Sequence, residues 1–207
     1  MMTEEFYKRY PQLKENEEKI ENAIKAIITS YKNGGTILLC GNGGSESDCD
    51  HIVGEFMKGF MLPRRFKGAD KQAIAEAFGD ENAANNFQYA VPAISLPSLS
   101  AVNTAFINDV APDFVYAQLM YGYGKKGDVA IGISTSGNSK NVVNALIAAK
   151  AKGLVTIALT GCKPNRSENI ADIAIKVCET ETYKVQELHL PVYHYICAEV
   201  ERRLFGE

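Results

Sequence analysis

The 207-residue chain has no apolar stretch that approaches the length of a membrane span, and its charged N-terminal segment has no apolar core of the kind found in signal peptides. It also has no basic run longer than Pro63-Arg64-Arg65-Phe66-Lys67, and its net charge is -3. That distribution offers no electrostatic surface for nucleic acid. We therefore expect a soluble, cytoplasmic protein that binds neither a membrane nor nucleic acid.

Cysteine is sparse as well. The five cysteines are odd in number, show no C-x-x-C spacing and have mostly apolar neighbours, which is typical of reduced thiols in a cytoplasm rather than of a disulfide framework; they are Cys40, Cys49, Cys162, Cys178 and Cys197. With 46% hydrophobic residues, a chain of this length can bury one sizeable core. We expect residues 1–207 to form a single domain.

Short apolar runs alternate with helical patterns along the chain. Strands are predicted at 36–40, 90–96, 129–134, 155–159 and 173–177. Helices are predicted over about 4–31, within an N-terminal helical segment 1–33, and at 46–59, 112–121, 139–152 and 184–204. The order of strand then helix indicates an α/β fold with a doubly wound, five-stranded parallel sheet and helices on both faces.

The segment from about 61 to 89 interrupts this alternation. It contains Pro63, Gly68 and a helical pattern from Lys71 to Phe78, and it is longer than the usual connection between a strand and a helix. We interpret it as an insertion within the domain, serving as a lid or an oligomer contact. Arg64 and Arg65 could reach a phosphate or a polyol, although a solvated pair of charges is the simpler expectation.

A glycine-rich loop follows the first predicted strand. Gly41, Gly43 and Gly44 allow a tight turn, so that amides at the start of the next helix can point at an anion, and Asn42 and Ser45 can add side-chain hydrogen bonds. The spacing matches neither the dinucleotide fingerprint nor the P-loop. A simple phosphate ester is the expected ligand.

A second polar loop follows the predicted strand that ends near residue 134. It carries four hydroxyl groups before a helix, those of Ser134, Thr135, Ser136 and Ser139. Such a sequence could serve only as a helix-capping turn. Capping needs one hydroxyl per helix, however, and two such loops at the carboxyl ends of two strands favour phosphate binding.

His51 and Glu55 are four residues apart, so they share one face of the predicted helix. Nitrogen and carboxylate ligands suit zinc. A His/Glu pair at this spacing is more often a surface hydrogen bond, so the pair alone leaves both interpretations open.

Four motifs together resemble the sugar isomerase (SIS) domain. They are GNGGS-x-x-D-x-x-H-x-x-x-E, ISTSGNS-x-N-V, LTG and Q-E-x-H-x-x-x-x-H, which begin at residues 41, 133, 159 and 186. Within that family the chain is most similar to the bacterial phosphoheptose isomerases. The resemblance implies a single SIS domain with a flavodoxin-like sheet that isomerises sedoheptulose 7-phosphate to D-glycero-D-manno-heptose 7-phosphate.

The resemblance also implies site residues and partners. One zinc per active site would be held by His51, Glu55, Gln186 and His194, and Glu55 and His194 would exchange protons with the sugar. The implied substrate-binding residues are Asn42, Gly43, Gly44, Ser45, Ser134, Thr135, Ser136, Ser139 and Gln186. The family forms homotetramers whose active sites lie at subunit interfaces. His189 also matches a family histidine, and we expect it to be a packing or hydrogen-bonded residue.

The sequence departs from the family pattern at several points. The family's Asp after the second strand is replaced by Leu96-Pro97-Ser98-Leu99-Ser100, and its Asp-Arg pair by Tyr183-Lys184-Val185. Gln186 and His194 would lie about 12 Å apart along an ideal helix, and Pro191 between them is expected to kink or break it. An isomerase of another sugar phosphate, or a non-catalytic SIS protein that binds a phosphosugar or regulates replication, therefore remains an alternative.

Overall fold

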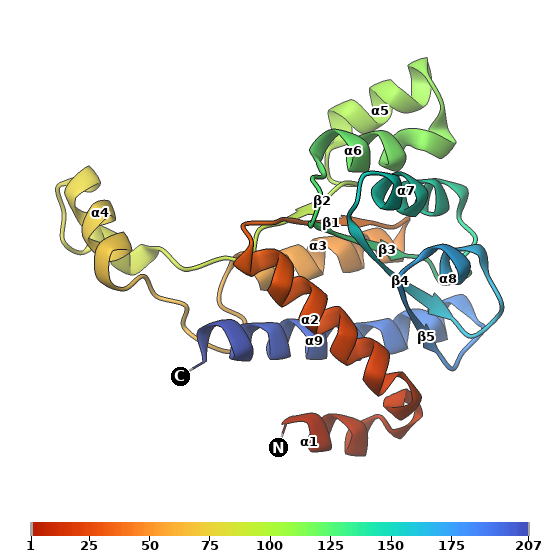
Figure 1. Ribbon diagram of the computed structural model, residues 1–207, viewed down its shortest axis with the longest axis horizontal. Coiled ribbons are helices and arrows are strands. Elements are labelled where there is room, and N and C mark those ends of the chain that lie inside the picture. Colours follow the sequence, from red (N-terminus) through yellow and green to blue (C-terminus); the bar gives the residue numbers. More distant parts are fainter. Residues whose placement is uncertain (1, 207) are drawn as a thin grey trace.

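A five-stranded, all-parallel sheet lies at the centre of the computed structural model, which describes residues 2–206 (Figure 1). The strands are β1 (Ile37–Cys40), β2 (Ala93–Ser95), β3 (Val129–Ile133), β4 (Val155–Gly161) and β5 (Ile173–Val177). Every residue of β1 and β3 is buried, as expected for strands that are covered on both faces. The predicted α/β fold with a doubly wound parallel sheet is confirmed.

Helices cover the two faces of the sheet and bury a separate apolar cluster on each. The helices are α1 (Met2–Arg9), η1 (Pro11–Asn16), α2 (Glu17–Lys32), α3 (Gly44–Met57), α4 (Gly68–Phe78), η2 (Ala83–Asn86), α5 (Ser100–Asp109), η3 (Pro112–Phe114), α6 (Val115–Tyr123), α7 (Lys140–Ala151), α8 (Arg166–Ile170) and α9 (Thr182–Phe205). Leu39 of β1 packs with α2, α3 and α9, whereas Leu38 packs with α6 and α7. Alternate side chains of one strand therefore reach both clusters.

The strand order β2-β1-β3-β4-β5 reverses direction between β1 and β3. Cys40 at the end of β1 is in register with Gly132 of β3. The loops that leave these two strands therefore start side by side at the carboxyl edge of the sheet. In doubly wound sheets this is where ligands bind, and both polar loops identified in the sequence begin here.

The N-terminal segment predicted as one helix is divided into α1, η1 and α2. Tyr10 separates the first two elements, with φ -126° and ψ 66°, outside the helical region. Proline disfavours helical geometry in the residue before it, and Pro11 follows Tyr10 directly. The break is therefore encoded locally, and α2 is the long helix that leads into β1.

Two other features differ from expectation. The sequence pattern did not predict α5 or the short α8, and β2 has three residues where a longer strand was expected. Pro191 neither ends nor splits α9, which runs unbroken from Thr182 to Phe205. Pro191 and Val192 are both buried, so tertiary packing outweighs the single backbone hydrogen bond that proline removes.

The segment from 61 to 89 forms an arm that stands away from the body of the molecule (Figure 1). Its helix α4 contains no buried residue. The base of the arm is anchored, because Arg64 is only 2% exposed and does not belong to a solvated charge cluster.

Arg64 forms an ion pair with Glu201 of α9, with 2.7 Å between Nε and Oε1, and both side chains are fully buried. Its other guanidinium nitrogens donate to the backbone carbonyls of Phe56 (2.7 Å) and Glu55 (2.9 Å) at the end of α3. Glu201 also accepts hydrogen bonds from the backbone amides of residues 60, 61 and 62. One buried pair thus joins α3, α9 and the base of the arm.

None of the helices between residues 2 and 206 combines the length and apolar character that crossing a membrane requires.

Replacing Glu201 by Gln should lower the free energy of unfolding by about 3–5 kcal/mol, because it leaves the buried Arg64 charge without a counter-ion. Urea unfolding measures this change. Arg65→Ala is the matched control, since Arg65 is exposed, and should shift stability by no more than about 0.5 kcal/mol. Equal unfolding midpoints for the Glu201 variant and the unmodified protein would contradict this account of the pair.

Candidate active site

The loop after β1 places the start of α3 at the carboxyl edge of the sheet. Gly43 has φ 56°, a left-handed conformation that a side chain would disfavour, and α3 begins at the next residue. A Cβ added to Gly44 would lie 2.3 Å from Nε2 of Gln186, so any larger residue would displace this side chain. Ser45 is buried within the first turn of α3. The loop therefore presents a helix N-terminus, the kind of group that binds anions.

The loop after β3 gathers its hydroxyl groups beside the start of α7. Ser134 Oγ lies 3.1 Å from Ser139 Oγ and 3.4 Å from Ser136 Oγ. The backbone carbonyl of Thr135 accepts from the amide of Gly161, which ties the loop to β4. Gly137 has φ 64°, and an added Cβ would lie 2.2 Å from the side chain of Asn165. The turn is thus fixed by both its backbone and its neighbours.

The two loops are joined directly. Asn42 of the first loop and Asn141 of α7 exchange two side-chain hydrogen bonds of 2.9 Å. Two helix N-termini and several hydroxyl groups therefore face one region at the point where the strand order reverses. This arrangement can hold a phosphate group with amides and hydroxyls alone.

A second group of polar side chains lies further along α3. Glu55 Oε1 is 3.2 Å from His51 Nε2, and the same nitrogen of His51 is 3.4 Å from Nε2 of His194 on α9. Burial lowers the pKa of His194, nearby His51 lowers it further, and Glu55 acts in the opposite direction. Glu55 is mostly buried and His51 is substantially exposed, with side-chain exposures of 12% and 42%. Carboxylate and imidazole groups thus meet at an accessible position.

These donor atoms suit zinc in kind, and two of their separations are close to those between zinc ligands. Around a tetrahedral zinc with bonds of about 2.0–2.1 Å, neighbouring ligand atoms are about 3.3 Å apart. His51 contacts Glu55 and His194 in turn. Among residues 2–206, however, no three His, Cys, Asp or Glu side chains form a group that could hold a metal ion as they stand.

Gln186 lies at the other end of α3 from this group. Its side chain rests against Gly44, whereas His51 is seven residues further along, about 10 Å at the helical rise. The structure therefore places Gln186 beside the phosphate loops and not beside His51, Glu55 and His194. The four zinc ligands implied by the resemblance are not brought together within one chain.

His189 is separate from both groups. Its ring is fully buried, and burial lowers its pKa to about 4. Neither ring nitrogen makes a hydrogen bond of normal geometry within the described residues. Its position in the core agrees with a packing residue.

Two residues near His51 were missed by sequence reasoning. The hydroxyl of Tyr193 lies 3.0 Å from His51 Nδ1 and donates to Asp48 Oδ1 over 3.2 Å. Burial raises the pKa of Asp48, while the bond from Tyr193 and the nearby His51 oppose the rise. Asp48 precedes His51 by three residues and so shares its helix face, which is a signal that the sequence did contain. Nothing in the sequence pattern pairs Asp48 or His51 with Tyr193.

A carboxylate also lies at the loop after β2, where the family's acid is missing. The hydroxyl of Ser98 donates to Asp50 of α3 and lies 3.3 Å from Ser95 Oγ. An acid from α3 thus contacts the loop that lacks one of its own.

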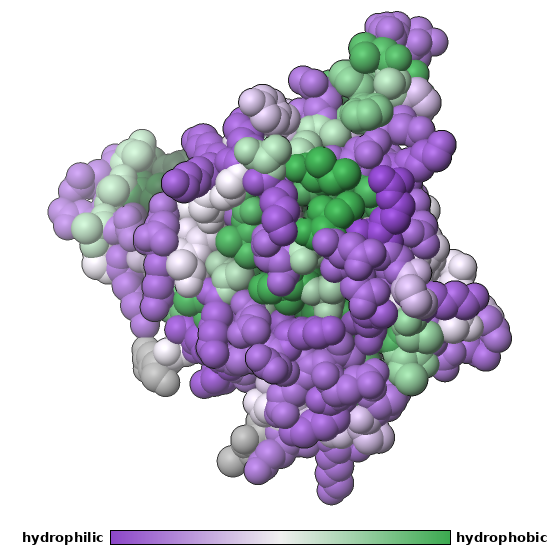
Figure 2. All heavy atoms as spheres, turned by 45° about the vertical axis from the view of Figure 1, so that its right-hand side comes forward, coloured by the Kyte–Doolittle hydropathy of each residue, from purple (hydrophilic) through white to green (hydrophobic). Residues whose placement is uncertain are grey.

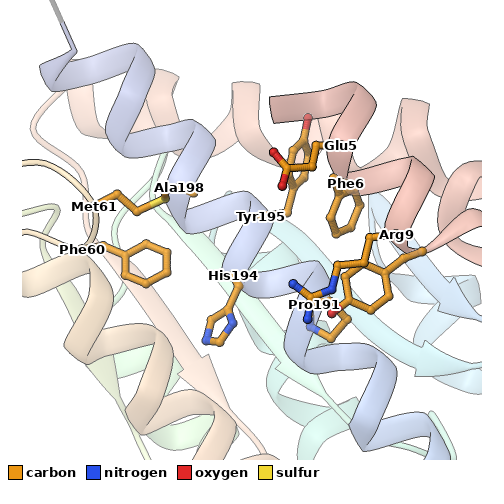
Figure 3. Close-up of a pocket in the computed structure, with 10 residues that line it drawn as sticks. Glu5, Phe6, Arg9, Phe60, Met61, Pro191, His194, Tyr195 and Ala198 are labelled. Atoms are coloured by element: carbon orange, nitrogen blue, oxygen red, sulfur yellow. The ribbon is translucent and has the colours of Figure 1, made fainter. Parts of the chain in front are cut away.

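A hollow of about 270 Å³ opens beside His194, between α1, α9 and the residues that follow α3 (Figure 3). Phe6, Phe60 and Met61 make much of its lining apolar. The ring of His194 points away from Phe6 and Tyr195 in this view. Because the hollow lacks the hydroxyl and amide groups gathered at the two loops, we do not place the sugar phosphate in it.

Comparisons with known proteins agree with this geometry. The family model described as "SIS domain" matches residues 4–70 and 71–161. "Phosphoheptose isomerase 2" of Campylobacter jejuni is 39% identical over 188 residues, covering 91% of this chain and 82% of the relative. "Phosphoheptose isomerase" of Clostridium acetobutylicum is 36% identical over 190 residues, covering 92% and 85%.

Among solved structures, "phosphoheptose isomerase GmhA from Neisseria gonorrhoeae" superposes with a TM-score of 0.75 at 27% identity, covering 96% of this chain and 94% of that one. The strand order, the two loops at its reversal point and these matches lead to one conclusion. The chain belongs to the SIS domain family.

Proposed function

We propose that this protein is a phosphoheptose isomerase that interconverts sedoheptulose 7-phosphate and D-glycero-D-manno-heptose 7-phosphate. One observation carries the proposal: α3 begins at the glycine-rich loop beside Gln186 and carries the His51–Glu55 pair, in contact with His194, further along. Relatives with 35–39% identity over nine-tenths of the chain are named phosphoheptose isomerases, which supports the same activity.

The reaction moves a proton between C1 and C2 of the sugar through an enediolate. Glu55, as a carboxylate, removes the proton from carbon, and His194 exchanges a proton with the adjacent oxygen. The two side chains meet through His51, which contacts both of them. This proximity supports their roles as base and acid toward one substrate.

The phosphate is held at the two joined loops. The backbone at Gly43 and Gly44 and the side chains of Asn42, Ser45, Ser134, Thr135, Ser136, Ser139 and Gln186 form the proposed substrate-binding set. Neutral donors dominate this set, so it binds the phosphate through directed hydrogen bonds rather than through a basic cluster.

A non-catalytic phosphosugar-binding or replication-regulating protein is the disfavoured alternative. Such a protein needs the phosphate loops but has no use for an acid and a base at hydrogen-bonding distance. Glu55 and His194 each contact His51 here, which favours an enzyme.

Sedoheptulose 7-phosphate should be the best substrate in a panel of five-, six- and seven-carbon ketose phosphates, with unphosphorylated sedoheptulose turned over poorly. Chromatographic separation of the isomeric products measures this. Glu55→Gln and His194→Asn should each lower kcat by at least about 100-fold, in the range for loss of a general acid or base.

Glu187→Gln is the control, because Glu187 is exposed on α9 and should retain full activity. Near-normal turnover in either active-site variant would remove that residue from catalysis. If the protein prefers another ketose phosphate, that sugar replaces sedoheptulose 7-phosphate as the proposed substrate.

We further propose that one zinc ion binds at His51, Glu55 and His194, with Gln186 as a fourth ligand after rearrangement or from a neighbouring subunit. The 3.2 and 3.4 Å separations between the donor atoms support this. When bound, zinc would polarise the sugar oxygens that carry developing negative charge.

Protein purified without chelator should carry one zinc per chain by elemental analysis. Glu55→Gln and His51→Ala should each lower that content, because each removes one donor, while the Glu187→Gln control should not. A chain that contains no metal and remains fully active after treatment with chelator would refute the zinc proposal.

A homotetramer with active sites at its subunit interfaces is also proposed. The phosphate loops and the group around His51 lie at different levels of α3, and His51 remains exposed in the single chain. Large apolar side chains are exposed as well, among them Val102, Ile107, Val110 and Phe78. Figure 2 shows apolar surface at the tip that carries α5 and on the arm. Exposed apolar surface of this kind marks contact sites.

Sedimentation analysis should therefore find a four-chain species at concentrations used for assay. A fully active monomer would contradict the tetramer.

We also propose that residues 1–207 act in the cytoplasm as a single SIS domain with an insertion at 61–89. Cys40, Cys49 and Cys197 are buried free thiols, which suits a reducing compartment. Recovery of the protein with periplasmic or membrane fractions would contradict this location.

A further inference from the structure

Tyr193 connects two helices at the candidate active site. Its side chain is only 3% exposed on the inner side of α9, directly before His194 in sequence. Its hydroxyl lies between His51 Nδ1 at 3.0 Å and Asp48 Oδ1 at 3.2 Å. Asp48, Tyr193 and His51 therefore form a continuous chain of hydrogen bonds that ends at the imidazole ring.

The direction of these bonds follows from the number of protons available. The Tyr193 hydroxyl has one proton, which it donates to the carboxylate oxygen of Asp48. Its oxygen then accepts the proton on Nδ1 of His51. Nε2 of His51 faces the Glu55 carboxylate at 3.2 Å, which accepts a proton, and Nε2 of His194 at 3.4 Å.

The rest of the surroundings does not hold His51 in this state. His51 is largely exposed, with 42% of its side chain accessible. The rings of Tyr193 and His194 contact it edge-on, with centroids 5.5 and 4.9 Å away, but ring contacts do not choose between the two tautomers. Glu55 accepts at Nε2 and so favours a proton there, which leaves the hydrogen bond to Tyr193 as the contact that keeps a proton on Nδ1.

Asp48 in turn holds Tyr193. Its second carboxylate oxygen is buried and has no hydrogen-bond partner among the described residues. Leaving a buried carboxylate with few partners is costly unless it has a role. The one side-chain hydrogen bond recorded for Asp48 goes to Tyr193, so the structure uses this acid to orient the hydroxyl.

We propose that Tyr193, oriented by Asp48, is a positioning residue that keeps the proton of His51 on Nδ1 and directs Nε2 at Glu55 and His194. The inference rests on the proposed isomerase function for its kinetic consequence. Its structural part, the tautomer of His51, is independent of any activity.

The test compares Tyr193→Phe with Tyr195→Phe. Both variants remove one hydroxyl from a buried tyrosine of α9, but the hydroxyl of Tyr195 bonds to Thr3 instead of to the active site. Nitrogen-15 NMR of the imidazole groups in metal-free protein reads the tautomers, and three histidines make assignment practical.

His51 should carry a proton on Nδ1 in the unmodified protein and in Tyr195→Phe, whereas in Tyr193→Phe the proton should move to Nε2, which faces Glu55. Tyr193→Phe should also lose about 10–100-fold in kcat or in zinc affinity, the range for partners that orient a metal ligand. KM for the sugar phosphate should stay within about twofold, because the phosphate loops are untouched.

Asp48 provides a second pair of variants. Asp48→Asn keeps an oxygen that accepts from Tyr193 and should preserve the tautomer, whereas Asp48→Ala should reproduce the effect of Tyr193→Phe. Thermal unfolding of all variants shows whether each is folded. If Tyr193→Phe does not fold, the comparison of Asp48→Asn with Asp48→Ala tests the role of Tyr193 instead.

An unchanged tautomer in a folded Tyr193→Phe or Asp48→Ala variant would overturn the inference, as would an equal kinetic loss in Tyr195→Phe. If the unmodified protein turns over no ketose phosphate, the proposed function fails while the NMR comparison still decides the role of Tyr193.

Discussion

The buried pair between Arg64 and Glu201 fixes how α3 lies against α9, and the candidate active site depends on that register. Arg64 binds the last carbonyls of α3, while Glu201 belongs to the last turns of α9. At the other end of the pairing Gln186 rests against Gly44. His51 meets α9 between these two contacts. A slip by one turn would move one helix about 5.4 Å past the other and would separate His51 from His194. A buried charged pair that holds the end of α3, at Glu55 itself, therefore sets this geometry.

The sheet supplies the second constraint. Because alternate residues of β1 enter opposite apolar clusters, a shift of the strand by one residue would exchange the side chains packed in the two clusters. The register of β1 with β3 then brings the two polar loops together, and the bonds between Asn42 and Asn141 hold them there. The proposed phosphate site is thus positioned by backbone pairing, and the proposed acid–base group by helix pairing. The two halves share α3, which belongs to both arrangements.

Much of this arrangement could be predicted from the sequence, because it depends on local patterns. Alternating apolar runs and helical periods specify the parallel sheet, and glycine and hydroxyl residues at strand ends indicate where a ligand binds. Tertiary contacts could not be predicted in the same way. Arg64 has the neighbours of a surface residue, and only the distant Glu201 makes it a buried one. From the sequence alone, Pro191 predicts a helix break. Only its burial in the folded chain explains why α9 continues through it. Tyr193 has the pattern of a core residue, and its polar role exists only because His51 lies opposite.

The shared helix has a further consequence for the substrate. A helix rises about 1.5 Å per residue, so the distance between the start of α3, where we propose that the phosphate binds, and the pair at His51 and Glu55 cannot adjust to the ligand. A phosphate held at the loops leaves the carbonyl end of the sugar to reach a fixed point, either on the same chain or on a neighbour in the proposed tetramer. For the proposed isomerase, the length of the sugar therefore becomes a criterion for turnover without any contact that recognises its length. This distance does not read the stereochemistry of the sugar.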